Sequence, residues 1–151
     1  MNILYEIKQI PFKGYGIISK QIIKKGEIIW NLNNDKSVIS ISDLMIEDYL
    51  KKFNDEQIIY IFDHMYCFNG ICYDIQHSDT RFTNHSKNPT SFVNKDGNSV
   101  AARDINIGEE ITEDYTTYDN YLPNYYRLMV KYIGKNWTEL ANDWNQYIKA
   151  K

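Results

Sequence analysis

The sequence predicts a fold of short strands and tight turns, with one helical insert and a helical C-terminal segment. Short runs of alternating apolar and polar residues are bounded by glycine and asparagine, as in half-buried strands. Apolar residues take helical spacing over 42–62 and again after residue 120. A length of 151 residues fits one domain with a real core, and no linker, repeat or low-complexity segment interrupts it.

The N-terminal part reads as successive strands. Residues 3–10 alternate loosely and predict a first strand. Gly14 and Gly16 then mark a turn in which the backbone comes close to another group. Lys24-Lys25-Gly26-Glu27 predicts a further turn, followed by a strand over 28–30.

The middle of the chain adds the helical insert and more strands. We expect the insert to begin with Ser42 or Asp43 as its N-cap and to break at Asn54. Beyond it the sequence predicts a hairpin over 65–74, an irregular region over 76–90, and strands near 91–94 and 99–103 around the Asp96-Gly97 turn.

The C-terminal part changes to helices. Pro123 opens one at a position where its missing N–H does no harm, and Gly134 is a natural C-cap. A second helix is expected from about Thr138. Its apolar face should pack on the β core or on a second subunit, or else form a lid over a cofactor. That face contains Trp137, Leu140, Ala141, Trp144 and Ile148.

Two cysteines flank the predicted hairpin turn. With Asn69-Gly70 as its loop, Cys67 falls opposite Cys72, so a disulfide is sterically conceivable. The N-terminus lacks a signal-peptide pattern, so we expect two reduced, partly buried thiols. A zinc site with His64 and His77 is the alternative, but a tight hairpin would not point all four side chains inward.

Composition limits the classes of partner. Apolar residues at 43% and charged residues at 25% are typical of a folded chain. A net charge of −3 argues against nucleic acid and is compatible with a basic peptide. No apolar run approaches membrane-spanning length, so we expect no membrane association and an intracellular location, cytoplasmic or nuclear.

Two polar stretches are not explained by packing alone. Residues 81–89, Arg-Phe-Thr-Asn-His-Ser-Lys-Asn-Pro, take polar groups inward after an apolar Phe, and buried polar groups need partners. Residues 108–115, Gly-Glu-Glu-Ile-Thr-Glu-Asp-Tyr, end a strand-like segment on an acidic pair and a tyrosine. Gly14-Tyr15-Gly16 precedes both. Each motif alone is weak, and their occurrence in this order is what is specific.

This ordered set resembles the SET domain over residues 11–118. The matching pattern is Gly-x-Gly, Ile-x-x-Gly-Glu-x-Ile, Arg-Phe-x-Asn-His-Ser-x-x-Pro and Ala-x-Arg-Asp-Ile-x-x-Gly-Glu-Glu-Ile-Thr-x-Asp-Tyr. The resemblance implies a mainly β fold, a β-clip of several small sheets with a knot-like crossing. It also implies a protein-lysine N-methyltransferase that uses S-adenosyl-L-methionine as methyl donor.

The resemblance also implies particular site residues. The Gly-x-Gly segment should line the methionine end of the cofactor, and the Asn-His pair should contact its amino group and adenine side. Tyr115 matches the catalytic tyrosine, which orients the lysine amine, and no metal is expected. The residues expected to bind the cofactor are Lys13, Gly14, Tyr15, Gly16, Asn84, His85 and Tyr115.

The chain departs from the family pattern in three ways. Lys87 and Thr90 stand where Cys and Asn are common. Glu113 replaces the Phe or Tyr that often sets the number of methyl groups added, and strand alternation would place it on the same side as Tyr115. No Cys follows Cys72, so the zinc module that often follows the domain is absent.

We therefore expect a SET domain over 1–118 and a C-terminal helical extension over 119–151 that closes the site or packs on the core. The expected partner is a protein with a lysine in a basic segment, a histone tail being the leading candidate, and a homodimer is compatible with the aromatic extension. One alternative is a SET-fold binding module without turnover, in which Glu113 blocks the channel. A zinc-knuckle nucleic-acid binder is disfavoured by the acidic charge balance. The aromatic residues of the extension that could close the pockets are Tyr118, Tyr121, Tyr125 and Trp137.

Overall fold

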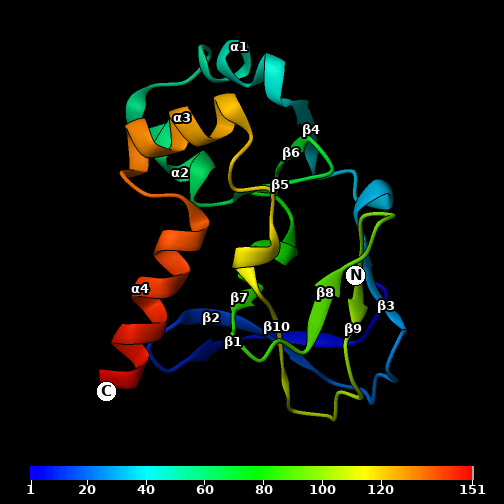
Figure 1. The fold of residues 1–151 in the computed structure, drawn as a ribbon. Helices are drawn as coiled ribbons and strands as arrows, with labels where there is room; N and C mark the ends of the chain where they lie inside the picture. The colour runs from blue at the N-terminus through cyan, green and yellow to red at the C-terminus, as the bar shows by residue number, and fades with distance from the viewer. Residues whose placement is uncertain (151) are drawn as a thin grey trace. The chain divides into compact units, whose positions relative to one another are not determined.

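A computed structural model describes residues 1–150, with side chains described as far as residue 145. The chain divides into two compact units, each made of two separate stretches of sequence (Figure 1). The first unit combines residues 1–36 with 79–114, and the second combines 37–78 with the part of the chain from 115 onward. Small sheets dominate and a few helices accompany them, as the sequence predicts.

The first unit contains a four-stranded sheet of order β1-β2-β10-β7. Neighbouring strands are antiparallel except for β7, which pairs parallel to β10. This parallel pairing sets the Asn-His segment directly beside Thr112 and Glu113. The strands are β1 (Tyr5–Ile10), β2 (Gly14–Ser19), β10 (Glu110–Glu113) and β7 (Asn84–His85).

A second, three-stranded sheet in the first unit has the order β3-β9-β8. Its strands are β3 (Ile28–Asn31), β9 (Asn98–Ala101) and β8 (Ser91–Val93), and a short 3-10 helix, η1 (Leu32–Asn34), follows β3. The core of the unit is aliphatic, as expected where β-branched side chains meet on pleated surfaces. It consists of Ile17, Ile23, Ile29, Ala101, Ile105 and Ile111.

The second unit contains a sheet of order β4-β6-β5 and most of the helices. Its strands are β4 (Ile39–Ser42), β6 (Ile71–Asp74) and β5 (Met65–Phe68). The helices are η2 (Asp43–Met45), α1 (Ile46–Leu50), α2 (Asp55–Phe62), α3 (Pro123–Ile133) and α4 (Trp137–Ala150). Two further 3-10 turns are η3 (Asp79–Phe82) in the first unit and η4 (Tyr115–Thr117) in the second.

The helical insert breaks where predicted, but its expected N-cap has another function. The first part ends at Leu50, and Asn54 caps α2 through a reciprocal capping box with Gln57. Ser42 makes no side-chain cap bond. The Asp43 carboxylate instead accepts hydrogen bonds from the backbone N–H groups of Asn124 and Tyr125, at 3.1 and 2.8 Å. Asp43 therefore caps α3, where an anion also complements the helix dipole.

The cysteine pair differs from our expectation. Cys67 lies opposite Cys72, as the hairpin register predicts, with 4.1 Å between their Cα atoms. Both are fully buried and form a disulfide, so the expected reduced, partly buried thiols are wrong. Directly opposed residues of an antiparallel pair bring their side chains close enough for this bond.

The zinc alternative has no support from the described part of the chain. Among those residues, no group of three or more His, Cys, Asp or Glu side chains could hold a metal ion. His64 Nδ1 instead lies 2.9 Å from the carbonyl oxygen of Tyr60.

The C-terminal helices contribute to the core of the second unit. The Tyr125 hydroxyl and the Trp137 indole N–H both donate to the carbonyl of Met65, at 3.1 and 2.8 Å. Burial raises the pKa of Tyr125 well above its usual range, so this phenol remains a donor. Ala141 is also buried, whereas Trp144 is 39% exposed, and the Ile148 side chain lies outside the described residues. Trp137 thus packs in the core of the second unit, with Leu140 against it.

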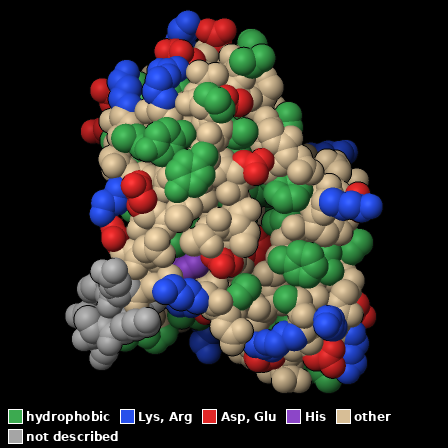
Figure 2. Space-filling model, in the orientation of Figure 1, with side chains coloured by type: hydrophobic (Ala, Val, Ile, Leu, Met, Phe, Trp, Pro, Cys, Tyr) green, Lys and Arg blue, Asp and Glu red, His purple; other side chains and the backbone are tan. Residues whose placement is uncertain are grey.

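The surface shown in Figure 2 mixes both signs of charge. On the visible face Lys and Arg side chains lie among Asp and Glu side chains, with no broad region of one sign. Within residues 1–150, no helix is both long and apolar enough to cross a bilayer.

Candidate active site

The Gly-x-Gly segment lies in a close approach of three strands. Gly14 begins β2 with a φ of +82°, in the left-handed region that favours glycine. At Gly16 an added Cβ would lie 2.7 Å from both Glu110 Oε1 and Ile10 Cγ1, and 3.0 Å from Asn84 Nδ2. A Cβ at Gly16 would therefore displace neighbouring side chains, so the position favours glycine.

The Asn84 side chain is fixed on the other side of this approach. Its Nδ2 donates to the carbonyl oxygen of Tyr15 at 2.9 Å and to Glu110 Oε1 at 2.7 Å. Because both amide hydrogens are used, Oδ1 is the atom of the side chain that remains for a ligand's donor.

Lys13 joins the same group of residues. Its ammonium lies 3.1 Å from Glu110 Oε2, and the two side chains are 24% and 18% exposed. Lys13, the Tyr15 carbonyl, Gly16 and Asn84 are thus brought together around one carboxylate. Four of the predicted cofactor residues converge in this way.

Glu110 itself was missed by the sequence reasoning. The signal was present in the Gly-Glu-Glu motif, of which the first Glu belongs to the turn before β10 and the second begins the strand. Glu109 pairs with Arg103 at 3.1 Å and accepts from the Asn106 N–H at 2.6 Å. These bonds lower the pKa of Glu109 and stabilise the turn before β10. Only Glu110 faces the Gly-x-Gly segment.

His85 and Tyr15 lie beside this group, with different surroundings. His85 is buried, and its Nδ1 is 3.8 Å from an Asp114 carboxylate oxygen. The Tyr15 ring is 57% exposed and meets Phe82 edge-on, with 6.2 Å between centroids. The Arg81 guanidinium lies over the same Phe82 ring at 4.4 Å.

Glu113 is held inside the first unit. The Ser99 hydroxyl donates to its carboxylate at 2.6 Å, and the residue is 7% exposed. Strand β10 ends at Glu113, and a 3-10 turn begins at Tyr115. The strand alternation that we used to relate Glu113 to Tyr115 therefore does not extend to the tyrosine.

Tyr115 belongs to the second unit and lies in an aromatic cluster. Its ring stacks on Tyr118 and meets Trp137 edge-on, each with 5.4 Å between centroids. Trp144 is a further edge-on neighbour at 6.0 Å. The Asn120 side chain donates to the Tyr115 carbonyl at 3.1 Å and so holds its backbone. Among the aromatic residues proposed for the extension, Tyr118 and Trp137 contact Tyr115.

The residues of the first unit fit the amino-acid end of S-adenosylmethionine. That end presents a carboxylate and an ammonium group. The Lys13 ammonium matches the carboxylate, and Asn84 Oδ1 matches the ammonium. Gly16 has no Cβ, which leaves room for the Glu110 and Asn84 side chains that form this arrangement. The charges of the two side chains therefore fit the group.

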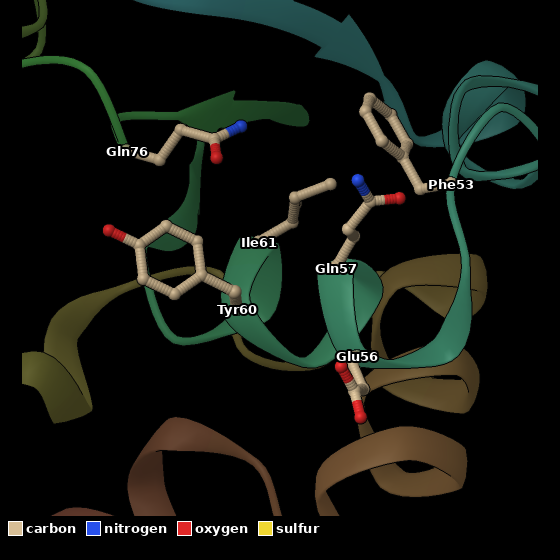
Figure 3. A pocket seen from close by; sticks show the side chains of 6 residues that line it. All are labelled: Phe53, Glu56, Gln57, Tyr60, Ile61 and Gln76. Carbon is tan, nitrogen blue, oxygen red and sulfur yellow. The ribbon is translucent and has the colours of Figure 1, made fainter.

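A separate hollow of about 240 Å³ lies in the second unit (Figure 3). The Tyr60 ring and the side chains of Gln57 and Gln76 line it, and Gln76 is tied to Asp74 at 2.8 Å. None of the predicted site residues lines this hollow, which also includes Phe53, Glu56 and Ile61.

Replacing Asn84 by Ala is expected to remove most of the affinity for S-adenosylmethionine while leaving the fold intact. The change deletes the amide that both neighbouring acceptors hold in place. Calorimetry on wild type and variant, with a thermal melt of each ligand-free protein, would measure both effects. Unchanged affinity would refute the assignment of Asn84.

Comparisons with known proteins show the family to which the chain belongs. A family model described as "SET domain" matches residues 14–116. The "Histone-lysine N-methyltransferase, H3 lysine-36 specific" of Candida albicans is 33% identical over 126 residues, covering 77% of this chain. This chain spans 14% of that relative's length. Among solved structures, the Neurospora SET domain protein DIM-5, described as a histone lysine methyltransferase, has a TM-score of 0.56 at 17% identity. That match covers 76% of this chain and 52% of the other, and it shows the fold. The chain belongs to the SET domain family.

Proposed function

We propose that this chain transfers methyl groups from S-adenosylmethionine to a lysine side chain of a protein. The observation that supports it most directly is the arrangement of Lys13 and Asn84 about Gly16, which matches the charges of the cofactor's amino-acid end. Membership of the SET domain family supports the same activity. His85 and Gly14, on the same strands, are proposed to complete the binding site through their backbone.

The cofactor, when bound, supplies an electrophilic methyl group on a positively charged sulfur. In that transfer the lysine nitrogen would form the new bond to the methyl carbon as the carbon–sulfur bond breaks, and the amine would release a proton to solvent. The protein must hold the two reactants in line, which lowers the entropic barrier. Lys13 and Asn84 fix one reactant through groups remote from the reacting bond.

Tyr115 is proposed to act on the other reactant. Its hydroxyl would orient the incoming amine and favour methyl transfer electrostatically. The rings of Tyr118, Trp137 and Trp144 make its surroundings apolar, which lowers the pKa of a lysine and favours the neutral nucleophile. The same aromatic rings also accommodate a methylated ammonium.

We propose a basic protein segment as the substrate, with a histone tail as the leading candidate, and a nuclear or cytoplasmic location. Two named relatives are histone lysine methyltransferases, and the net charge of −3 suits a basic partner. The alternative of a non-catalytic binding module required Glu113 to block the channel. The Glu113 carboxylate instead accepts a hydrogen bond from the Ser99 hydroxyl.

The division into a SET domain over 1–118 and an extension over 119–151 is proposed in modified form. Helices α3 and α4 share a core with residues 37–78, so the extension belongs to the second unit. Residues 115–118 belong to that same unit.

The test is methyl transfer from labelled S-adenosylmethionine. The purified protein would be incubated with core histones and, separately, with ribosomal proteins, and labelled lysines would be identified by mass spectrometry. Label on lysine that depends on the protein supports the function. Binding of the cofactor with no label on any protein in either mixture, or in lysates of candidate hosts, would favour a binding module.

A further inference from the structure

One carboxylate connects the elements of the cofactor site. Glu110 lies on β10, which is flanked by β2 on one side and β7 on the other. Its Oε1 accepts from Asn84 at 2.7 Å, and its Oε2 accepts from Lys13 at 3.1 Å. Gly16, on β2, leaves the space that this carboxylate occupies. Both carboxylate oxygens of Glu110 therefore accept hydrogen bonds from residues of the proposed site.

The carboxylate decides which atom Asn84 offers to a ligand. A side-chain amide can be turned so that either its oxygen or its nitrogen faces a given direction. Here two acceptors, the Tyr15 carbonyl and Glu110, face the same end of the amide. Only the NH₂ group satisfies both. The Asn84 oxygen must then point the other way, where it can accept from an ammonium group.

The carboxylate also restricts Lys13. A free lysine side chain has several rotatable bonds and loses considerable entropy when a ligand fixes it. Glu110 fixes Lys13 in advance and takes one of its three donors, which leaves two for a ligand's carboxylate. The Lys13–Glu110 pair has no net charge. It therefore suits a ligand end that carries one positive and one negative charge.

We propose that Glu110 is the positioning residue of the cofactor site, and that it selects for a zwitterionic amino-acid end. It presents a fixed acceptor on Asn84 and a fixed cation on Lys13. A ligand needs both an amino group and a carboxylate to use this arrangement. This inference rests on the proposed function and assigns Glu110 a role in that same site.

The test compares two ligands that differ at this end. S-adenosylhomocysteine has the amino-acid end, and methylthioadenosine lacks it. Glu110→Gln keeps the shape of the side chain, but it places an NH₂ group, itself a donor, against either the Asn84 amide nitrogen or the Lys13 ammonium. We expect the Kd for S-adenosylhomocysteine to rise about 10-fold or more, as for loss of a charged hydrogen bond, with the Kd for methylthioadenosine unchanged.

Glu109→Gln is the matched control. It makes the same substitution at the neighbouring carboxylate, which bonds Arg103 and the Asn106 N–H instead. Its affinity for both ligands should equal that of the wild type. In turnover, Glu110→Gln should raise the KM for S-adenosylmethionine and leave kcat near the wild-type value.

The outcomes separate the two proposals. If the wild type binds S-adenosylhomocysteine and Glu110→Gln binds it equally well, the positioning role is wrong and the function stands. Glu110 has only a structural role if Glu110→Gln weakens the binding of both ligands by the same factor. The same conclusion follows if the ligand-free variant melts at a temperature so low that partial unfolding accounts for its weaker binding. If the wild type binds neither ligand, the proposed function itself fails.

Discussion

Replacing Tyr115 by Phe is expected to lower the rate of methyl transfer by roughly 10²-fold or more, while cofactor affinity is retained. The change removes one hydroxyl and little volume, so the ring contacts with Tyr118 and Trp137 should persist. What is lost is a preorganised contact to the reacting amine. Single-turnover rates at saturating cofactor would measure the loss, and calorimetry would verify binding.

Tyr121→Phe is the control for this experiment. Tyr121 follows in the same segment but is 66% exposed, so losing its hydroxyl should leave the rate unchanged. A Tyr115→Phe protein that methylates as fast as the wild type would show that Tyr115 is not catalytic.

Replacing Trp137 by Ala is expected to lower the free energy of unfolding by about 3–5 kcal/mol, the usual cost of truncating a buried Trp. The indole is 7% exposed, and its N–H donates to the Met65 carbonyl. Truncation leaves both a cavity and an acceptor that loses one of its two donors. Denaturant unfolding followed by far-UV circular dichroism would measure the change.

Trp144→Ala separates packing from a lid. Trp144 also lies beside Tyr115 but is 39% exposed, so its truncation should cost much less stability. A lid residue would instead weaken ligand binding at an unchanged melting temperature. If Trp137→Ala behaved in that second way, our assignment of Trp137 to the core would be wrong.

Local features of the fold could be predicted from the sequence. The Asn54 break, the Asn69-Gly70 hairpin and the Gly134 helix end each depend on the conformational preference of one or two residues. Asp43 shows the limit of this reasoning. It looked like a cap for the helix that follows it, but its partners lie 81 and 82 residues further along the chain. Propensity alone cannot identify such a partner.

The same limit applied to the site. The family pattern identified Asn84 and the Gly-x-Gly segment, and the first unit brings them together. Glu110 was overlooked because alternation tells which side of a strand a residue takes, and not what it meets there. The predicted hairpin register placed Cys67 opposite Cys72 correctly. We nevertheless expected reduced thiols, because we inferred an intracellular location from the N-terminal sequence, and the disulfide was therefore missed.

The interleaving of the two units has a consequence for how the chain acquires its structure during synthesis. Strand β2 forms early, but its neighbour β10 lies more than 90 residues later, and β7 can pair only once β10 is present. In the same way, the Met65 carbonyl of β5 gains its two hydrogen-bond donors only after Tyr125 of α3 and Trp137 of α4 have been synthesised. Contacts so distant in sequence slow folding, because the intervening loops must be closed first. While a ribosome adds the intervening residues, over several seconds, β2 has only the β1 hairpin as a partner. We therefore expect nascent chains stopped before residue 110 to be protease-sensitive throughout, with protection of both units appearing late and nearly together.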